Sequence, residues 1–168
     1  MASFPERLRA TQHTAFHLEM RDSYTPTDPT YQAWKHGDPF DVEEYYRAWT
    51  ELVREATSRG VAVRRTRIVS EPVSDYIRFE HAITHMNVAA GEEVRWLPRR
   101  QASDIALPGN DFWILDGSLV RFAHFSGDGD SLGESGEEWS QDPTVARLCA
   151  SAFDAVWERA ILHEDYKV

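Results

Sequence analysis

Apolar residues recur along residues 41–60 at intervals of three and four, the spacing of a helix with one face on a core. Asp41 and the acidic residues behind it begin this segment, and Gly60 ends it, as helix-start and helix-stop residues do. The sequence therefore predicts one helix whose buried stripe consists of Tyr45, Trp49, Leu52, Val53 and Ala56.

Two more helices are predicted on similar grounds. One runs over about residues 74–90, because Pro72 and Ser74 precede it and Gly91 follows it. The other closes the chain from Pro143 to about residue 162. Residues 1–13 form an N-terminal segment that includes a short helix, and residues 21–40 form a long surface loop with one helical turn near Tyr31, suited to a lid or a partner contact.

Other segments alternate apolar and polar residues, which is the period of a half-buried strand. The segments "AFHLEM", "VAVRRTRIVS", "EEVRWLP", "DFWILD" and "SLVRFAHFS" show this pattern, and a last short strand is expected near Leu132. The predicted order is β-α-β-α-β-β-β-β-α. This order favours an α/β or α+β fold with a mixed sheet and helices packed on it.

Composition narrows the class of protein. A chain of 168 residues with 42% hydrophobic residues fits a single domain, and Cys149 has no cysteine partner. The N-terminus lacks the apolar run of a signal peptide, and no stretch is long enough to span a membrane, so a cytoplasmic location is expected. The net charge of −10 argues against direct nucleic-acid binding, while six Trp leave room for a homodimer interface.

The stretch "SEPVSDYIRFEHAITHMN" raises the question of a metal site, because His81 and His85 are four residues apart. On a helix, an apolar stripe of Phe79, Ile83 and Met86 faces the core and places both histidines on the opposite, solvated side. No third ligand is near in sequence, so neither a metal nor another cofactor is expected.

Polar residues flank this stripe and must find hydrogen-bond partners. Two interpretations stay open. In the first, Glu80 forms a structural pair with an arginine of the preceding strand; in the second, a pocket gathers polar groups around a ligand. The candidate ligand-binding residues are Arg65, Arg67, Glu71, Tyr76, Arg78, Glu80 and Asn87.

Familiar catalytic patterns are absent from the sequence. No G-x-S-x-G motif surrounds Ser70 or Ser74, and Ser74 is explained as a helix cap. "GDGDSLGE" lacks the spacing of a calcium loop and the lysine of a phosphate loop. Asp116 with Gly117 indicates a hairpin turn. We assign no catalytic residue.

The segments "RIVSEPVSDYIRFE", "NVAAGEEVRWLPR" and "LPGNDFWILDG" resemble an uncharacterised actinobacterial domain family over about residues 14–162. This resemblance implies genes that often lie near helix-turn-helix regulators. A weaker resemblance to phospholipase D-like sensor domains implies half of such a fold. Aligned on Asp116, Gly109 and Asp111 stand where that chemistry needs histidine and lysine, so phosphodiester cleavage is not expected.

Two functional hypotheses follow. The first is a non-catalytic binding or regulatory domain that works with a transcriptional regulator or a small ligand. The alternative is an enzyme that uses a glutamate as acid or base and an arginine to anchor a small anionic substrate. A raised carboxylate pKa in a concave pocket would favour the alternative.

Overall fold

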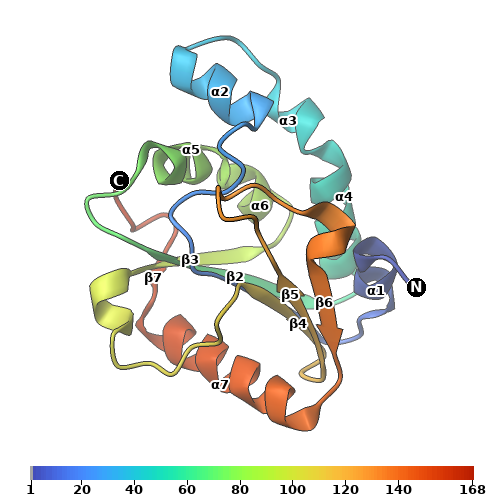
Figure 1. The fold of residues 1–168 in the computed structure, drawn as a ribbon. Helices are drawn as coiled ribbons and strands as arrows, with labels where there is room; N and C mark the ends of the chain where they lie inside the picture. Colours follow the sequence, from blue (N-terminus) through green and yellow to red (C-terminus); the bar gives the residue numbers. More distant parts are fainter. Residues whose placement is uncertain (1) are drawn as a thin grey trace.

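The computed structural model describes residues 2–168, and one seven-stranded mixed sheet runs through its centre (Figure 1). The strand order is β6-β5-β4-β1-β2-β3-β7. Strands β1, β2 and β3 pair in parallel, and the other neighbours are antiparallel. The predicted mixed sheet is confirmed. The strands are Thr14–Glu19 (β1), Ala62–Val69 (β2), Glu93–Pro98 (β3), Phe112–Leu115 (β4), Leu119–Ala123 (β5), Glu137–Ser140 (β6) and Ile161–Leu162 (β7).

Helices cover both faces of the sheet (Figure 1). One face packs on α7, and the opposite face carries the remaining helices. Short 3-10 turns lie at Arg99–Ala102 and Gly133–Gly136. The helices are Phe4–Ala10 (α1), Pro29–His36 (α2), Val42–Tyr45 (α3), Arg47–Ser58 (α4), Asp75–Ile83 (α5), His85–Ala89 (α6) and Pro143–Arg159 (α7).

Alternation along the strands divides the core between the two faces. Leu18 of β1 and Ile68 of β2 are fully buried against Phe153 of α7. On the other face, Ala15 and Val63 pack with residues of α1 and α4. Farther along the same two strands, that face carries polar side chains in place of apolar ones. Central strands covered on both faces normally read as apolar runs, so these polar positions call for a separate explanation.

The predicted helix over 41–60 is broken. It ends as α3 at Tyr45 and resumes as α4 at Arg47, with Tyr46 between them at φ −95° and ψ 8°. Leu52, Val53 and Ala56 are buried as expected, but Tyr45 is 52% exposed. The expectation for Tyr45 was wrong because the break changes the direction of the helix face.

The predicted helix over 74–90 is also divided, at Thr84. The Thr84 hydroxyl donates to the Glu80 carbonyl at 2.6 Å, which satisfies a helix carbonyl at this point. Ser74 caps α5 as expected, since its Oγ accepts from the Ile77 amide at 3.1 Å. His85 is exposed, but His81 is partly covered, because its Nε2 lies 3.0 Å from the Tyr166 carbonyl. The two histidines therefore do not form a solvated pair.

The strand expected near Leu132 is not formed. Ser131 makes an isolated bridge with Phe125, and the strand that pairs with β5 is β6, at Glu137–Ser140. The last helix ends at Arg159, before the predicted end, because residues 161–162 leave it to pair with β3 as β7. The loop over 21–40 contains α2, which is longer than the single turn expected.

The hairpin at Asp116 and Gly117 has the predicted geometry, with φ values of 47° and 65°. The Asp116 carboxylate also accepts the backbone amides of residues 12, 13 and 14 at 2.7–3.0 Å. It thereby ties the start of β1 to the β4–β5 turn.

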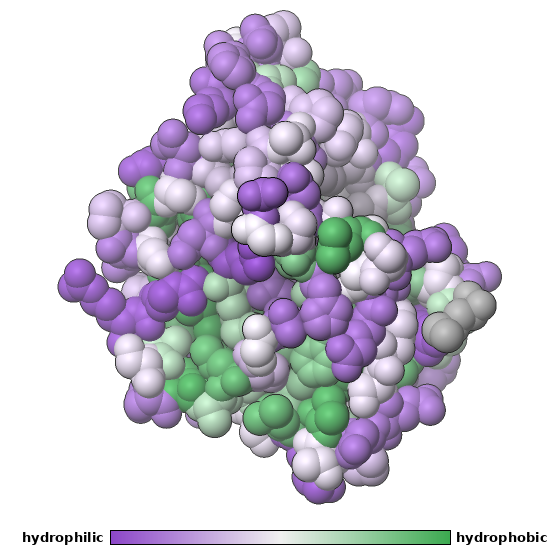
Figure 2. Space-filling model, viewed as in Figure 1, coloured by the Kyte–Doolittle hydropathy of each residue, from purple (hydrophilic) through white to green (hydrophobic). Residues whose placement is uncertain are grey.

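The visible surface is mostly hydrophilic, with apolar side chains gathered where α7 lies in Figure 1 (Figure 2). Leu148 of α7 is 44% exposed. Within residues 2–168, no helix combines the length and the apolar character needed to cross a membrane.

Candidate functional site

A buried carboxylate joins two buried arginines on the face of the sheet opposite α7. Glu19 ends β1, and its register partner on β2 is Arg67, with Arg65 two residues earlier on the same face. Nη1 of Arg65 donates to Oε1 of Glu19 at 2.6 Å, and Nε of Arg67 donates to Oε2 at 2.5 Å. All three residues are at most 8% exposed. Parallel pairing of β1 and β2 thus fixes this charge cluster.

Further partners complete the orientation of both guanidinium groups. Nε of Arg65 donates to Oε1 of Glu92 at 2.7 Å, and the Asn87 amide donates to the other oxygen of Glu92 at 2.6 Å. Nη1 of Arg67 donates to the Thr84 hydroxyl at 2.7 Å. Within residues 2–168, Nη2 of neither arginine makes a hydrogen bond. Each arginine is held rigidly and keeps a donor for a ligand.

The mutual attraction of these groups outweighs the cost of their burial. Burial raises the pKa of Glu19, but Arg65 and Arg67 hold that pKa well below its usual range. Burial lowers the pKa of Arg65, yet Glu19 and Glu92 raise it above its ordinary value. Glu19, Arg65 and Arg67 are therefore charged at neutral pH.

Glu80 on α5 is different, because no arginine hydrogen-bonds to its carboxylate. Its Oε2 lies 3.6 Å from Nε of Arg67 and, within residues 2–168, has no hydrogen-bond partner although it is buried. Burial raises the pKa of Glu80 to about 7, against the opposing attraction of Arg67 and with a further rise from the charge of Glu19. The Glu80 carboxyl is therefore divided between its two protonation states near neutral pH.

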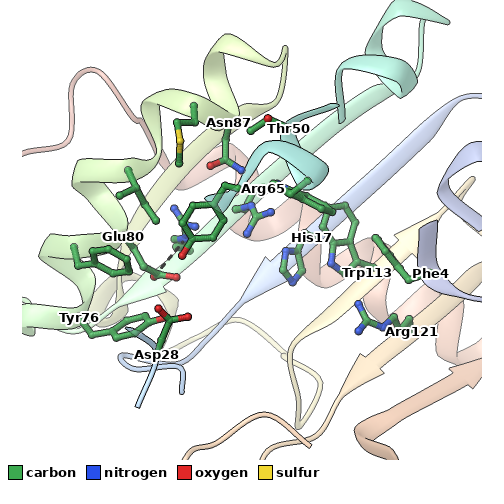
Figure 3. A pocket seen from close by; sticks show the side chains of 16 residues that line it. Phe4, His17, Asp28, Thr50, Arg65, Tyr76, Glu80, Asn87, Trp113 and Arg121 are labelled. Atoms are coloured by element: carbon green, nitrogen blue, oxygen red, sulfur yellow. Dashed lines mark ion pairs between the residues drawn. The ribbon is translucent and has the colours of Figure 1, made fainter. Parts of the chain in front are cut away.

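These groups surround a cavity of about 520 Å³ between the sheet and the helices above it (Figure 3). Glu80 and Tyr76 of α5 lie on one side, and Trp113 and Arg121 lie on the other, with Arg65 between them. Aromatic and aliphatic side chains supply most of the wall. The lining comprises Phe4, His17, Asp28, Tyr46, Trp49, Thr50, Arg65, Arg67, Tyr76, Phe79, Glu80, Ile83, Met86, Asn87, Trp113 and Arg121.

His17 of β1 presents a neutral imidazole to this cavity. Its ring stacks on Trp113, with centroids 4.3 Å apart and an interplanar angle of 16°. Burial lowers the pKa of His17 well below its ordinary value of 6.5, and the arginines nearby lower it further, against the attraction of Glu19. Nδ1 of His17 is buried and has no hydrogen-bond partner within the described residues.

Another buried carboxylate lies outside the cavity lining. Asp111 accepts the Met20 amide at 2.8 Å and the hydroxyl of Tyr24. Burial raises the pKa of Asp111 to about 6, although the hydrogen bond from Tyr24 opposes this. The negative charge of Asp111 adds to the rise in the pKa of Glu80.

The structure places five of the seven candidate residues on the cavity: Arg65, Arg67, Tyr76, Glu80 and Asn87. Two others lie elsewhere. Glu71 accepts the Tyr166 hydroxyl at 3.0 Å, and Nη1 of Arg78 donates to the Val73 carbonyl at 3.5 Å. The first contact joins the segment before α5 to the C-terminal segment, and the second joins α5 to the residues that precede it.

The pair of Glu80 with an arginine, expected in the structural interpretation, is formed only as a long ionic contact. Glu19 and Glu92 are the carboxylates that pair closely with the arginines, and sequence reasoning did not select either one. The same holds for His17, Trp113 and Arg121. Alternation in "AFHLEM" could have indicated His17 and Glu19, because it places both on one face of β1.

Residues 2–168 contain no group of three or more His, Cys, Asp or Glu side chains arranged to hold a metal ion. His81 lies beside His163, with ring centroids 4.5 Å apart. The hydrogen-bond partner of His81 is the Tyr166 carbonyl, and that of His163 is the Trp96 indole N–H.

Fold and site together define an α+β domain with a mixed sheet, a buried charge network and a cavity of ligand size. The chain belongs to the family described as "Domain of unknown function (DUF6879)", whose model matches residues 2–168. This confirms the resemblance to an uncharacterised domain family. No curated protein matches the chain.

Proposed function

We propose that this protein is a cytosolic regulatory domain that binds a small organic molecule in the cavity lined by Glu80. The observation that carries the proposal is the buried carboxylate of Glu80, which belongs to the cavity lining and whose Oε2 lacks a hydrogen-bond partner within residues 2–168. A buried polar atom without a partner costs free energy, and a ligand that supplies the partner recovers it.

The size and lining of the cavity support this proposal. Small-molecule sites are concave, mostly apolar and equipped with a few fixed polar groups, and they commonly enclose about 300–1,000 Å³. This cavity of about 520 Å³ lies in that range. The donors Nη2 of Arg65 and Arg67 are fixed by Glu19, Glu92 and Thr84, so a ligand meets them without an ordering cost.

A regulatory role is supported by the segment that closes the cavity. Asp28 and Tyr46 line it, and they come from either end of the segment that contains α2 and α3. Tyr31 of α2 contacts Tyr76 and Phe79 of α5 through ring centroids 4.9 and 5.6 Å apart. A bound ligand would strengthen this contact and change the surface that a partner meets. The partner that the family resemblance implies is a helix-turn-helix regulator.

One observation favours a second function, an enzyme with Glu80 as general acid or base. A pKa of about 7 suits proton transfer at neutral pH. Nη2 of Arg65 and Arg67 would anchor an acceptor or anionic group of the substrate. In this case the ligand would be converted, whereas a regulatory domain would return it unchanged.

The test is a thermal-shift screen of the protein against a metabolite library, with hits confirmed by native mass spectrometry. A ligand at ~100 times its Kd adds about 2.7 kcal/mol to the free energy of unfolding, which raises the Tm measurably. Glu80→Gln keeps the side-chain shape and should abolish or weaken the hit. Glu93→Gln is the matched control. Oε1 of Glu93 lies 3.0 Å from Nε of Arg64, and neither residue belongs to the cavity lining.

Each result has a defined meaning. A hit that Glu80→Gln weakens and Glu93→Gln leaves unchanged supports the binding site. Mass analysis of that ligand after incubation separates binding from turnover. A library without any hit, or hits that are insensitive to Glu80→Gln, would contradict the proposal.

A further inference from the structure

The unpartnered polar atoms of the cavity lie at its two opposite ends. Three of the six buried side-chain polar atoms without a hydrogen-bond partner in residues 2–168 belong to its lining: Oε2 of Glu80, Nδ1 of His17 and Nε of Arg121. Figure 3 shows Glu80 at one end and His17 with Arg121 at the other. One end therefore has a carboxylate oxygen without a donor, and the other has the Nε donor of Arg121 without an acceptor.

The Glu80 end has the chemistry of an ammonium site. Asp28 lies beside Glu80 and Tyr76 in Figure 3. Oδ1 of Asp28 accepts the Thr30 amide at 2.7 Å, and its Oδ2 makes no hydrogen bond within the described residues. The rings of Tyr46 and Tyr76 also line this end. Carboxylate oxygens together with aromatic rings are the groups that attract an organic cation.

The Arg121 end has the opposite character. The Arg121 guanidinium lies over the Phe4 ring, 4.8 Å from its centroid, and its Nη2 donates to Glu137 at 2.6 Å, while its Nε has no hydrogen-bond partner within residues 2–168. His17 lies beside it on Trp113, and Nη2 of Arg65 adds a further donor. An acceptor group therefore meets the guanidinium of Arg121 at this end and Nη2 of Arg65 toward the middle, while Nδ1 of His17 lies 3.5 Å from Oε1 of Glu19.

Between the two ends, the cavity offers no further isolated charge. Arg65 and Arg67 are each paired with Glu19 at 2.6 and 2.5 Å, and Arg65 is also paired with Glu92. The apolar part of the lining includes Trp49, whose ring centroid lies 5.7 Å from that of Trp113, and Phe79, whose ring centroid lies 5.8 Å from that of Tyr76. A simple anion would leave Oε2 of Glu80 without a partner, and a simple amine would leave Nε of Arg121 without one.

We infer that the ligand is a zwitterion, with an amine at the Glu80 and Asp28 end, a carboxylate at the Arg121 and His17 end, and an apolar body against Trp49 and Phe79. This inference rests on the proposed function and specifies its ligand class. It differs from the small anionic substrate of the alternative hypothesis by the added amine.

The experiment uses three matched series of probes. These are ω-aminoalkanoates of about four to about ten carbons, with para-(aminomethyl)benzoate as a ring-bearing member, and the n-alkylamines and n-alkanoates of equal length. Calorimetric titration into the full chain measures Kd. We expect one length of zwitterion to bind at least about tenfold more tightly than the amine and the acid of that length.

Variants then assign the two ends. Glu80→Gln should weaken binding of the zwitterion and the alkylamine and leave binding of the alkanoate unchanged. Arg121→Gln should weaken binding of the zwitterion and the alkanoate and leave binding of the alkylamine unchanged. His17→Phe keeps the ring stack on Trp113 and replaces Arg121→Gln if that variant does not fold. Glu93→Gln should leave all three series unchanged.

The outcomes separate this inference from the proposed function. If alkanoates bind as tightly as zwitterions, or if every zwitterion fails to bind, the inference is overturned. The proposed function then still stands on any library hit that Glu80→Gln weakens. If the library also gives no such hit, both are overturned.

Discussion

Oε2 of Glu80 lies 3.6 Å from Nε of Arg67, close enough for charge attraction but too far for a hydrogen bond. The reason is that the same Nε donates to Glu19 at 2.5 Å. Glu80 is thus attracted by the positive charge of Arg67 but accepts no hydrogen bond from it, and burial is the largest influence on the pKa of Glu80. This is why one carboxylate of the network is free to respond to a ligand while Glu19 is not.

The raised pKa of Glu80 predicts a pH-dependent stability. Because the folded pKa of about 7 exceeds the ordinary value of 4.5, the native state binds more protons than the unfolded chain between these values. The free energy of unfolding should therefore fall as pH rises from about 4.5 to about 7, by on the order of 3 kcal/mol. Glu80→Gln should remove this decline in urea denaturation at about pH 5 and about pH 8. A pH profile identical to that of the wild type would contradict the assignment.

Glu19 should be far more important for stability than an exposed carboxylate. Glu19→Gln leaves the buried charges of Arg65 and Arg67 without their shared partner, which should cost about 3–5 kcal/mol in the free energy of unfolding. Glu93→Gln, at the half-exposed pair with Arg64, should cost about 0.5 kcal/mol or less. Chemical denaturation measures both variants. Similar losses for the two would argue against the buried network as a stabilising unit.

The C-terminal segment should detach in acid. Nδ1 of His163 accepts the Trp96 indole N–H at 3.1 Å, which requires a neutral ring at that nitrogen. Burial lowers the pKa of His163 to about 4, and the charges of His81 and Arg67 lower it further. With the folded pKa below its ordinary 6.5, the stabilisation from His163 is present at neutral pH and is lost as pH falls through about 6.5 to about 4.

Hydrogen exchange of the amides of residues 161–168 measures this release. His163→Gln keeps an acceptor for Trp96 without a titrating group, so it should reduce the acid sensitivity of the segment. If the variant and the wild type lose protection over the same pH range, His163 is not the responsible group.

Cys149 should be unreactive in the native protein. It is fully buried in α7, and burial raises the pKa of its thiol to about 11. Modification by a disulfide reagent should therefore require unfolding and should accelerate with denaturant. Cys149→Ala/Ser151→Cys is the matched control, because Ser151 is an exposed position on the same helix. Rapid native-state modification of Cys149 would show that α7 opens locally.

Local patterns predicted the elements that depend on neighbouring residues. The period-two segments became β1 to β5, Ser74 caps α5, and Asp116 and Gly117 form the hairpin turn. The breaks at Tyr46 and Thr84 could not be predicted, because contacts with other elements, such as the hydrogen bond of Thr84 with Arg67, accompany them. The short strand β7 was missed for the same reason, since it forms only by pairing with β3.

The residues of the candidate site show the same difference between what local patterns predict and what tertiary contacts decide. The sequence by itself selected Tyr76, Glu80 and Asn87, because polar residues beside an apolar stripe must be partly buried. It selected Arg65 and Arg67 as arginines of the preceding strand that could reach them. Only the tertiary structure decided their partners. Glu19 lies 46 positions from Arg65, and Glu92 lies 27 positions from it. Parallel pairing of β1 with β2 brings Glu19 to the arginines, whereas local periodicity shows which face a side chain takes but not which distant strand lies beside it.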